Sequence, residues 1–359
     1  MSGSHARARR PSLSRRSKVL AAATGVLVVG GTLGYFVVVP QKAPAFVRSA
    51  MATVGIDLDE GADPTAPTPT CPLSGESARG GVPSRPALAV KVENLPDARP
   101  QAGLRSADIV YEEPVEGGIT RFIAVFQCHD VERVGPVRSA RNADPDVLSQ
   151  FGVPVLAYSG GAPNVVRVVE AADLVSIDET AGGDAFTRDD SRVSPHNLYT
   201  GTRAIYRVAK AGRQAPAPVF AYADELSQRA RRVSSIHLPF SSYSDVYWTW
   251  DRRAGEWRRA HGTEPHLDET GEPISATNVV VQIVSAVIPA GGITPQLGLT
   301  GSGRACVFRD GRMIVGRWER ASGHDVTTFV TKDGQEIELA PGRTWVELFP
   351  SGLTVETLR

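Results

Sequence analysis

The sequence is poor in cysteine and has no excess of charge of either sign. Three cysteines are too few for a disulfide-rich scaffold or for a zinc site built from thiolates. The 39 basic and 39 acidic side chains cancel, whereas a nucleic-acid-binding protein normally carries a basic excess. We therefore expect no nucleic-acid partner.

Common catalytic and cofactor-binding signatures are missing as well. The chain contains no G-x-x-x-x-G-K-[ST] phosphate loop, no S-x-x-K box of serine acyl-transferases and no H-E-x-x-H zinc motif. His261, His266 and Asp268 are spaced too loosely to predict a metal site. The sequence accordingly predicts no metal and no cofactor.

The chain does contain enough apolar material for a folded core. Hydrophobic residues make up 42% of its 359 residues, and five of the residues are tryptophan. This composition excludes wholesale disorder. At about 150 residues per domain, the length favours two or three domains.

The charges are unevenly distributed, and the N-terminus is basic. Residues 1–18 contain no acidic residue, and residues 19–39 (VLAAATGVLVVGGTLGYFVVV) contain no charge at all. At about 1.5 Å per residue, a helix over this apolar run would span roughly the 30 Å hydrocarbon core of a bilayer. We expect a transmembrane helix over 19–39, with the basic head 1–18 in the cytoplasm and the rest of the chain outside. The basic residues of the head are Arg7, Arg9, Arg10, Arg15, Arg16 and Lys18.

Two other interpretations of this run were weighed. Ala43-Pro44-Ala45 has the small-x-small pattern of a signal-peptide cleavage site, but the apolar run is longer than the roughly 7–15 residues of a signal peptide. Gly30 and Gly34 form a G-x-x-x-G pair that packs some membrane helices together, although glycine is common in such helices anyway. An uncleaved anchor is the favoured interpretation.

The exported part is predicted to contain a spacer and two domains. Residues 40–86 are rich in proline towards their end, as extended linkers are. Alternating and continuous apolar runs predict strands over 87–93, 109–112, 119–128 and 153–158, and helices over 146–151, 164–172 and 202–211. From 219 to 359 the pattern is strand-rich, with hairpin signals at Asp310-Gly311 and Asp333-Gly334.

These patterns predict an α+β protein. We expect the single transmembrane helix to be followed by a mixed α/β sandwich-like domain over 87–218 and a mainly antiparallel β domain over 219–359. The second domain could share one core with the first.

The three cysteines lie outside the cell under this topology, where disulfides persist. The best pairing joins Cys71 to Cys128, which would tie the end of the linker to a strand of the first domain. Cys306, within an apolar strand, is then expected to be an inert free thiol.

The densest charged run is Glu112-Glu113-Pro-Val-Glu116-Gly-Gly-Ile-Thr-Arg121. Like charges this close raise a carboxyl pKa when they are partly buried, which suits a general acid. Glu113 and Glu116 are therefore candidate catalytic residues. A solvated acidic turn, or glutamates paired structurally with Arg121, explains the same residues without catalysis.

Two further clusters could line a binding site. Arg138 and Arg141 could grip a carboxylate or phosphate, or could simply neutralise the glutamates. His196, followed by Asn197, is a candidate base or anchor, although a lone histidine is more often structural. Tyr158 precedes a Ser-Gly-Gly turn whose N–H groups could cradle an anion.

At these clusters the sequence resembles the YerB-like family of bacterial envelope proteins, which pair an N- and a C-terminal domain of unknown function. The resemblance covers roughly residues 71–350 and implies a sandwich-like first domain and an extracytoplasmic location. Members are often lipoproteins with a lipidated cysteine directly after the apolar run, whereas Cys71 lies well beyond it here. The matching segments are 85–94 (RPALAVKVEN), 107–122 (ADIVYEEPVEGGITRF), 135–141 (GPVRSAR), 195–199 (PHNLY), 301–303 (GSG) and 308–311 (FRDG).

Three functions are compatible with these observations. The leading one is binding of a cell-wall glycan or an anionic envelope polymer. Its acidic groups would contact Arg121, Arg138 and Arg141, in a cleft lined by His196, Asn197 and Tyr158. The alternatives are a polymer hydrolase or lyase with a glutamate as general acid, and an interaction scaffold for envelope machinery.

Overall fold

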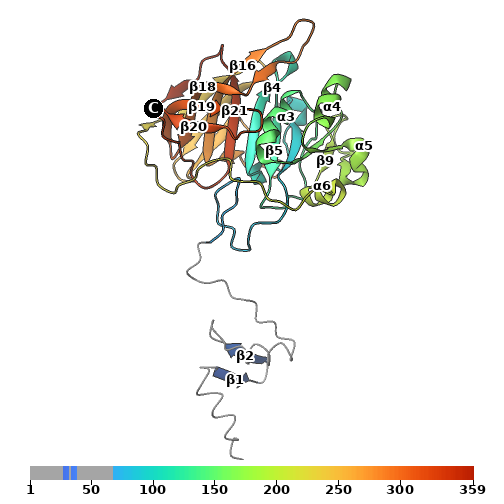
Figure 1. Cartoon of the computed structure of the whole chain (residues 1–359), viewed down its shortest axis with the longest axis vertical. Coiled ribbons are helices and arrows are strands. Elements are labelled where there is room, and N and C mark those ends of the chain that lie inside the picture. The colour runs from blue at the N-terminus through green and yellow to red at the C-terminus, as the bar shows by residue number, and fades with distance from the viewer. Residues whose placement is uncertain (1–26, 32–33, 39–67) are drawn as a thin grey trace, which may run out of the picture. The chain divides into compact units, whose positions relative to one another are not determined.

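The computed structural model describes residues 27–31, 34–38 and 68–359 of the chain (Figure 1). The chain divides into two compact units, 1–67 and 68–359. The basic head 1–18 and residues 40–67 of the predicted spacer lie outside the described residues.

The predicted transmembrane helix over 19–39 is wrong for the part of that range that is described. Two short strands, β1 (Leu27–Gly31) and β2 (Gly34–Val38), pair there antiparallel. Each strand contains two valines, and β2 adds Tyr35 and Phe36, and these residue types favour extended backbone over helix. Among the described residues, no helix is both long and apolar enough to cross a membrane.

Twelve strands of the second unit form one large sheet. Its order is β10-β19-β18-β16-β21-β4-β5-β3-β6-β7, with β17 added beside β16 and β20 beside β19. The strands are β3 (Leu88–Glu93), β4 (Ile109–Pro114), β5 (Thr120–Phe126), β6 (Val155–Tyr158), β7 (Val175–Asp178), β10 (Arg231–Arg232), β16 (Asn278–Val287), β17 (Gln296–Gly298), β18 (Gly301–Arg309), β19 (Arg312–Arg320), β20 (Thr328–Thr331) and β21 (Thr344–Pro350).

Strand β21 joins the two halves of this sheet. It pairs parallel with β16 on one side and parallel with β4 on the other, so strands from before residue 127 and after residue 277 belong to one sheet. The sequence predicted two domains of different architecture. The finding is instead a mostly β structure in which the backbone hydrogen bonds of the sheet are continuous across the expected boundary, because a long-range parallel pairing connects them.

A second sheet of six strands lies against one face of the large sheet, and its residues share a hydrophobic core with that face. A separate hairpin of β8 (Phe186–Arg188) and β9 (Leu198–Thr200) precedes the last helix. The strands of the second sheet are β11 (Ser235–Pro239), β12 (Asp245–Asp251), β13 (Glu256–His261), β14 (Glu264–Pro265), β15 (Ser275–Ala276) and β22 (Glu356–Leu358).

The helices are few and short, and the α-helices lie on the side of the unit that holds β4 and β5, away from β18, β19 and β20 (Figure 1). The α-helices are α3 (Ala143–Leu148), α4 (Pro163–Glu170), α5 (Glu179–Gly182) and α6 (Thr202–Ala209). The single-turn 3₁₀ helices are η1 (Pro96–Ala98), η2 (Leu104–Ser106), η3 (Glu116–Gly118), η4 (Ser149–Phe151) and η5 (Gly183–Ala185).

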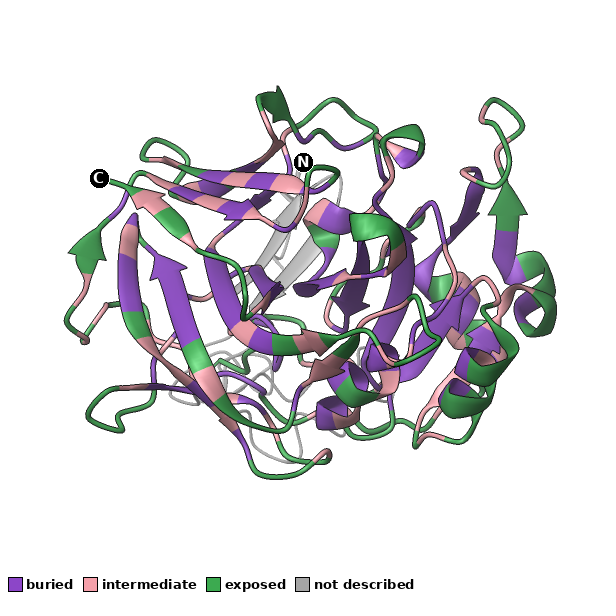
Figure 2. Cartoon of the chain, turned by 90° about the horizontal axis from the view of Figure 1, so that it is seen from above, coloured by how far each residue is buried: buried purple, intermediate pink, exposed green. Residues whose placement is uncertain are grey.

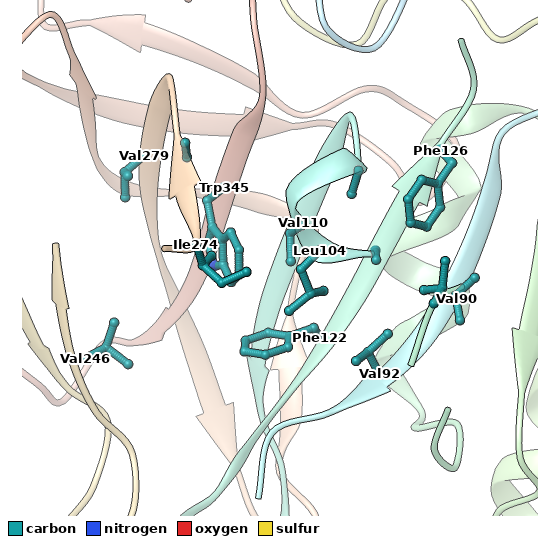
Figure 3. Close-up of a cluster of buried hydrophobic side chains, with 14 of the residues drawn as sticks. Val90, Val92, Leu104, Val110, Phe122, Phe126, Val246, Ile274, Val279 and Trp345 are labelled. Carbon is teal, nitrogen blue, oxygen red and sulfur yellow. The ribbon is translucent and has the colours of Figure 1, made fainter. Parts of the chain in front are cut away.

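Each face of the large sheet has its own hydrophobic core, and the central strands are buried on both faces (Figure 2). On the face that packs against the second sheet, the rings of Phe122 and Trp345 pack edge to face, with 5.2 Å between the ring centres (Figure 3). On the opposite face, Val165 and Val169 of α4 pack with the side chains of α3. Strands covered on both sides need near-continuous apolar runs, which β3, β5 and β16 have.

The start of the second unit is tied to the sheet by a covalent bond. A disulfide joins Cys71 to Cys128, just beyond β5, while Cys306 is a buried free thiol. Closing a loop of this size stabilises a folded chain by about 2–4 kcal/mol.

One fully buried ion pair connects the two sheets. Arg259 of β13 donates to both carboxylate oxygens of Glu112 on β4, at 2.9 and 2.7 Å, and neither side chain is exposed. Thr120 and Asn94 also donate to Glu112, at 2.6 and 3.3 Å. Because Glu112 comes from the first half of the chain and Arg259 from the second, the pair fixes how the halves meet.

Replacing Arg259 by methionine should leave the Glu112 carboxylate buried without its counter-charge. We expect the free energy of unfolding to fall by about 3–5 kcal/mol. The measurement is chemical denaturation of the purified chain, followed by tryptophan fluorescence.

The neighbouring Arg258 provides a matched control, because it carries an ion pair to Asp251 with half of its side chain exposed. Arg258→Met should cost no more than about 1 kcal/mol. A double variant, Glu112→Gln with Arg259→Met, should be more stable than Arg259→Met alone. Equal costs for the two arginine substitutions would contradict the assigned role.

Candidate functional site

Charged side chains lie side by side on one face of the large sheet, where β3, β4 and β5 meet. Arg121 of β5 sits in register between Glu93 of β3 and Glu113 of β4. Lys91, two residues before Glu93, shares the same face. Residues from the surrounding loops and α3 complete what we call the charged cluster, whose members are Lys91, Glu93, Glu113, Glu116, Arg121, Arg138, Arg141, Asp144 and His196.

At its deepest point, Lys91 is held between two carboxylates. Its ammonium group donates to Glu113 and, at 2.6 Å, to Asp144 of α3, and all three side chains are buried. The second oxygen of Asp144 accepts the backbone N–H of Arg141 at 2.8 Å. The other oxygen of Glu113 is buried without a hydrogen-bond partner among the described residues.

This environment opposes the ionisation of Glu113. Burial raises the pKa of the Glu113 carboxyl to about 7, and the nearby Asp144 charge acts in the same direction against the opposing effect of Lys91. A single cation between two carboxylates leaves one negative charge in excess, and a proton on Glu113 removes it. Glu113 is the one member of the cluster with such a raised value, but its exposed fraction is only 1%.

The pKa of Glu116 is shifted in the opposite direction. Burial alone would raise its pKa, but hydrogen bonds from Arg141 and from its own backbone outweigh that effect and hold the pKa at about 2. Arg141 donates to both carboxylate oxygens of Glu116. The Nη2 atom of Arg121 lies 3.6 Å from Oε1 of the same carboxylate. Arg121 also donates to the backbone oxygen of Ser139 at 3.0 Å. Glu116 is therefore a permanently charged anchor for two guanidinium groups.

The third part of the cluster is a carboxylate–histidine contact. The buried Glu93 binds Arg138 through one oxygen and the Nδ1 atom of His196 through the other, both at 2.9 Å. Because an ionised carboxylate can only accept, Nδ1 donates in this contact. A histidine held in this way is oriented by Glu93 across two distant segments of the chain.

A cleft of about 750 Å³ opens beside Glu116 and Arg141. One wall comes from the first half of the chain, and the other is the tip of the β16–β17 hairpin, residues 289–296. Thr294 of that tip donates to Glu116 at 3.2 Å, so the hairpin touches the charged cluster directly. The polar lining residues besides these are Ser139, Asn142, Asn164 and Gln296.

Two of the residues predicted for the site lie elsewhere in the fold. Tyr158 is 1% exposed, and its hydroxyl contacts Ser176 at 2.9 Å. Asn197 is also buried, where it accepts from Arg188 at 2.9 Å and donates to the backbone of Asp189. Neither lines the cleft. Arg121, Arg138, Arg141, Glu113, Glu116 and His196 are brought together in one cluster.

Sequence reasoning missed Lys91, Glu93 and Asp144. Lys91 and Glu93 interrupt a strand that is otherwise apolar, which was the available signal. Asp144 stands just before Pro145, where the sequence pattern indicates a helix start rather than a charge partner, and the capping position of α3 is Asn142. Within the described part of the chain, no group of three or more His, Cys, Asp or Glu side chains is arranged to hold a metal ion.

Comparison with known protein families matches nearly the whole second unit. Residues 73–230 match the family described as "Protein of unknown function (DUF3048) N-terminal domain", and residues 236–346 match the corresponding C-terminal domain. The chain belongs to this DUF3048 family, the YerB-like family. Its N-terminal segment supplies the charged cluster, and its C-terminal segment supplies the hairpin wall of the cleft.

A curated relative in the DUF3048 family is "Putative lipoprotein YerB" of Bacillus subtilis (strain 168). It is 31% identical over 298 residues, which is 80% of this chain and 88% of the relative. A crystal structure of the Bacillus subtilis YerB protein is similar as well, with a TM-score of 0.72 and 28% identity. The alignment covers 81% of this chain and all of that one.

The raised pKa of Glu113 predicts a pH-dependent stability. A group whose pKa is higher in the folded state than in the unfolded state stabilises the fold fully below its unfolded value and loses that contribution as pH rises through its folded value. The relevant window runs from pH 4.5 to about 7. Glu113→Gln, which mimics the protonated acid, should therefore gain stability relative to the wild-type chain as pH rises through this window.

The check is denaturant unfolding of both chains at several pH values between about 4 and 8. Glu225→Gln is the control, because Glu225 is exposed and forms no ion pair among the described residues. Its stability difference from wild type should stay constant. A constant difference for Glu113→Gln as well would show that the pKa of Glu113 is the same in the folded and unfolded states, which contradicts the raised value.

Proposed function

We propose that this DUF3048 protein is an extracytoplasmic, envelope-associated binding protein that holds a cell-wall glycan or an anionic envelope polymer in the cleft beside the charged cluster. The name of its Bacillus relative, a lipoprotein, supports the location. The Cys71–Cys128 disulfide supports it too, because such bonds persist outside the cytoplasm.

The polar side chains that line the cleft are the main support for this proposal. The amide and hydroxyl side chains among them suit the hydroxyl groups of a sugar polymer. The Arg141 guanidinium donates to Glu116 and to two backbone oxygens, which leaves one N–H of Nη2 for an acidic substituent. Arg141 is already oriented by Glu116, and Arg121 adds positive charge behind it. A ligand would therefore meet a guanidinium group whose position is fixed beforehand, which lowers the entropic cost of binding.

The environments of the two glutamates favour binding over acid catalysis. Glu116 has a pKa of about 2, so it carries no proton to donate near neutral pH. Glu113 has a raised pKa but is buried behind Lys91 and Asp144, away from the cleft lining. A general acid must reach the leaving group. Catalysis by either glutamate is thus the weaker interpretation.

Removing two amide groups from the cleft should weaken binding without disturbing the fold. Asn164 and Gln296 line the cleft from its two walls and are exposed. The double variant Asn164→Ala, Gln296→Ala should bind purified cell wall about tenfold more weakly or worse, since each lost hydrogen bond is worth about 0.5–1.5 kcal/mol. Co-sedimentation of the full chain with cell wall measures this effect.

A matched control replaces two exposed glutamines outside the cleft, Gln214→Ala with Gln335→Ala. This control should bind as the wild type does. Repeating the assay with wall stripped of its anionic polymer separates a glycan ligand from an anionic one. Equal binding by both double variants, or no binding by the wild type, would contradict the proposal and favour an interaction scaffold.

The same incubation also tests the enzyme alternative. The contact between Glu93 and His196 leaves an imidazole nitrogen that could act as a base. New soluble fragments of the wall that disappear with His196→Gln would favour a hydrolase or lyase over a binding protein.

A further inference from the structure

A second cavity, of about 480 Å³, lies away from the cleft and is strongly basic. Four arginines line it, with one acidic residue, Asp130. We call it the arginine pocket. Its arginines are Arg85, Arg203, Arg207 and Arg213.

The single carboxylate of the pocket is already paired with two of the arginines. Asp130 accepts from Arg85 at 2.5 Å through one oxygen and from Arg203 at 2.7 Å through the other. The Arg85 guanidinium also lies 4.7 Å from the ring centre of Tyr206, which orients it. Arg207 and Arg213 are exposed and form no ion pair or side-chain hydrogen bond within the described residues.

The spacing of these arginines concentrates positive charge. Arg203 and Arg207 are four residues apart on α6, so both project from the same face of the helix. Like charges in that arrangement destabilise a helix unless an anion lies between them. Net positive charge therefore remains in the pocket after Asp130 is paired, and an anionic ligand would neutralise it.

The pocket and the charged cluster lie at opposite ends of the same strand. Ser84, Arg85 and Pro86 of the pocket directly precede β3, and that strand ends at Glu93 of the charged cluster. A strand of this length spans roughly 20 Å. The pocket also lies where the second unit begins, because Asp130 follows the disulfide between Cys71 and Cys128 by two residues.

We propose that the arginine pocket binds the phosphate of an anionic lipid headgroup, which holds the cleft at the end of the molecule that faces away from the membrane. This inference rests on the envelope location proposed above but not on any ligand of the cleft. Guanidinium groups bind phosphate oxygens through paired N–H donors, and several arginines around one small cavity match a compact anionic group. The name of the Bacillus relative, "Putative lipoprotein YerB", favours a membrane source for the phosphate over a polymer.

The first test titrates inorganic phosphate into the full chain in neutral detergent. Arg207→Gln with Arg213→Gln removes the two arginines that hold nothing else, so the fold should persist. The phosphate dissociation constant should rise at least about tenfold, since hydrogen bonds to charged groups are the strong ones.

The second test follows amide hydrogen exchange over residues 203–213 in the full chain on vesicles. Exchange should slow at least about threefold on phosphatidylcholine vesicles with one-third phosphatidylglycerol, compared with phosphatidylcholine alone. The arginine-pocket variant should show no such slowing. Residues 1–67 are identical in both chains, so their contribution to vesicle binding cancels in the comparison.

Arg167→Gln with Arg229→Gln is the matched control, because it removes two exposed arginines that lie outside the pocket and form no ion pair among the described residues. It should behave as the wild type does in both tests. Unchanged phosphate affinity in the pocket variant would overturn the site. Phosphate binding without a difference between the two vesicle types would overturn the lipid assignment. The cleft variant Asn164→Ala, Gln296→Ala should keep both responses, so failure of the cleft proposal is distinguishable.

Discussion

The parallel pairing of β21 between β16 and β4 is the constraint on which the rest of the second unit depends. Through this strand, segments separated by most of the chain form one sheet with a core on each face. The cleft follows from the same pairing, since the first half of the chain forms one wall and the β16–β17 hairpin the other. The two family segments are therefore halves of one site as well as halves of one fold.

The charged cluster shows how such a sheet accommodates charges in its interior. A buried ion costs several kcal/mol in lost hydration, and each ion here is compensated by a partner of opposite sign. Register places Arg121 between two glutamates, and Lys91 lies between Glu113 and Asp144. At Glu113 the nearby positive charge does not offset the cost of burial, and the pKa is raised. At Glu116 the hydrogen bonds from Arg141 outweigh the cost of burial, and the pKa is lowered. Pairing of this kind fixes Arg141 at the edge of the cleft before any ligand arrives.

Local patterns in the sequence predicted much of this structure. The expected strand 87–93 became β3 (Leu88–Glu93), the expected helix 202–211 became α6 (Thr202–Ala209), and Asp310-Gly311 turns between β18 and β19 as predicted. The failures have physical causes. The apolar run 19–39 fits a helix or a strand by hydropathy alone, and β1 and β2 occupy its described residues. Pairing between β21 and β4 has no local signal. Lys91 and Glu93 were overlooked because charges in a strand usually face water.

The most direct test of this account asks whether the two family segments unfold together. All five tryptophans lie in the C-terminal segment, so hydrogen exchange must report on the N-terminal one. The measurement is amide exchange of β3 and β5 and of β16 and β18, across a series of denaturant concentrations below the unfolding midpoint. One continuous sheet predicts that both pairs of strands lose protection with the same free energy and the same dependence on denaturant. Loss of protection in β16 and β18 while β3 and β5 remain protected, or the reverse, would contradict it.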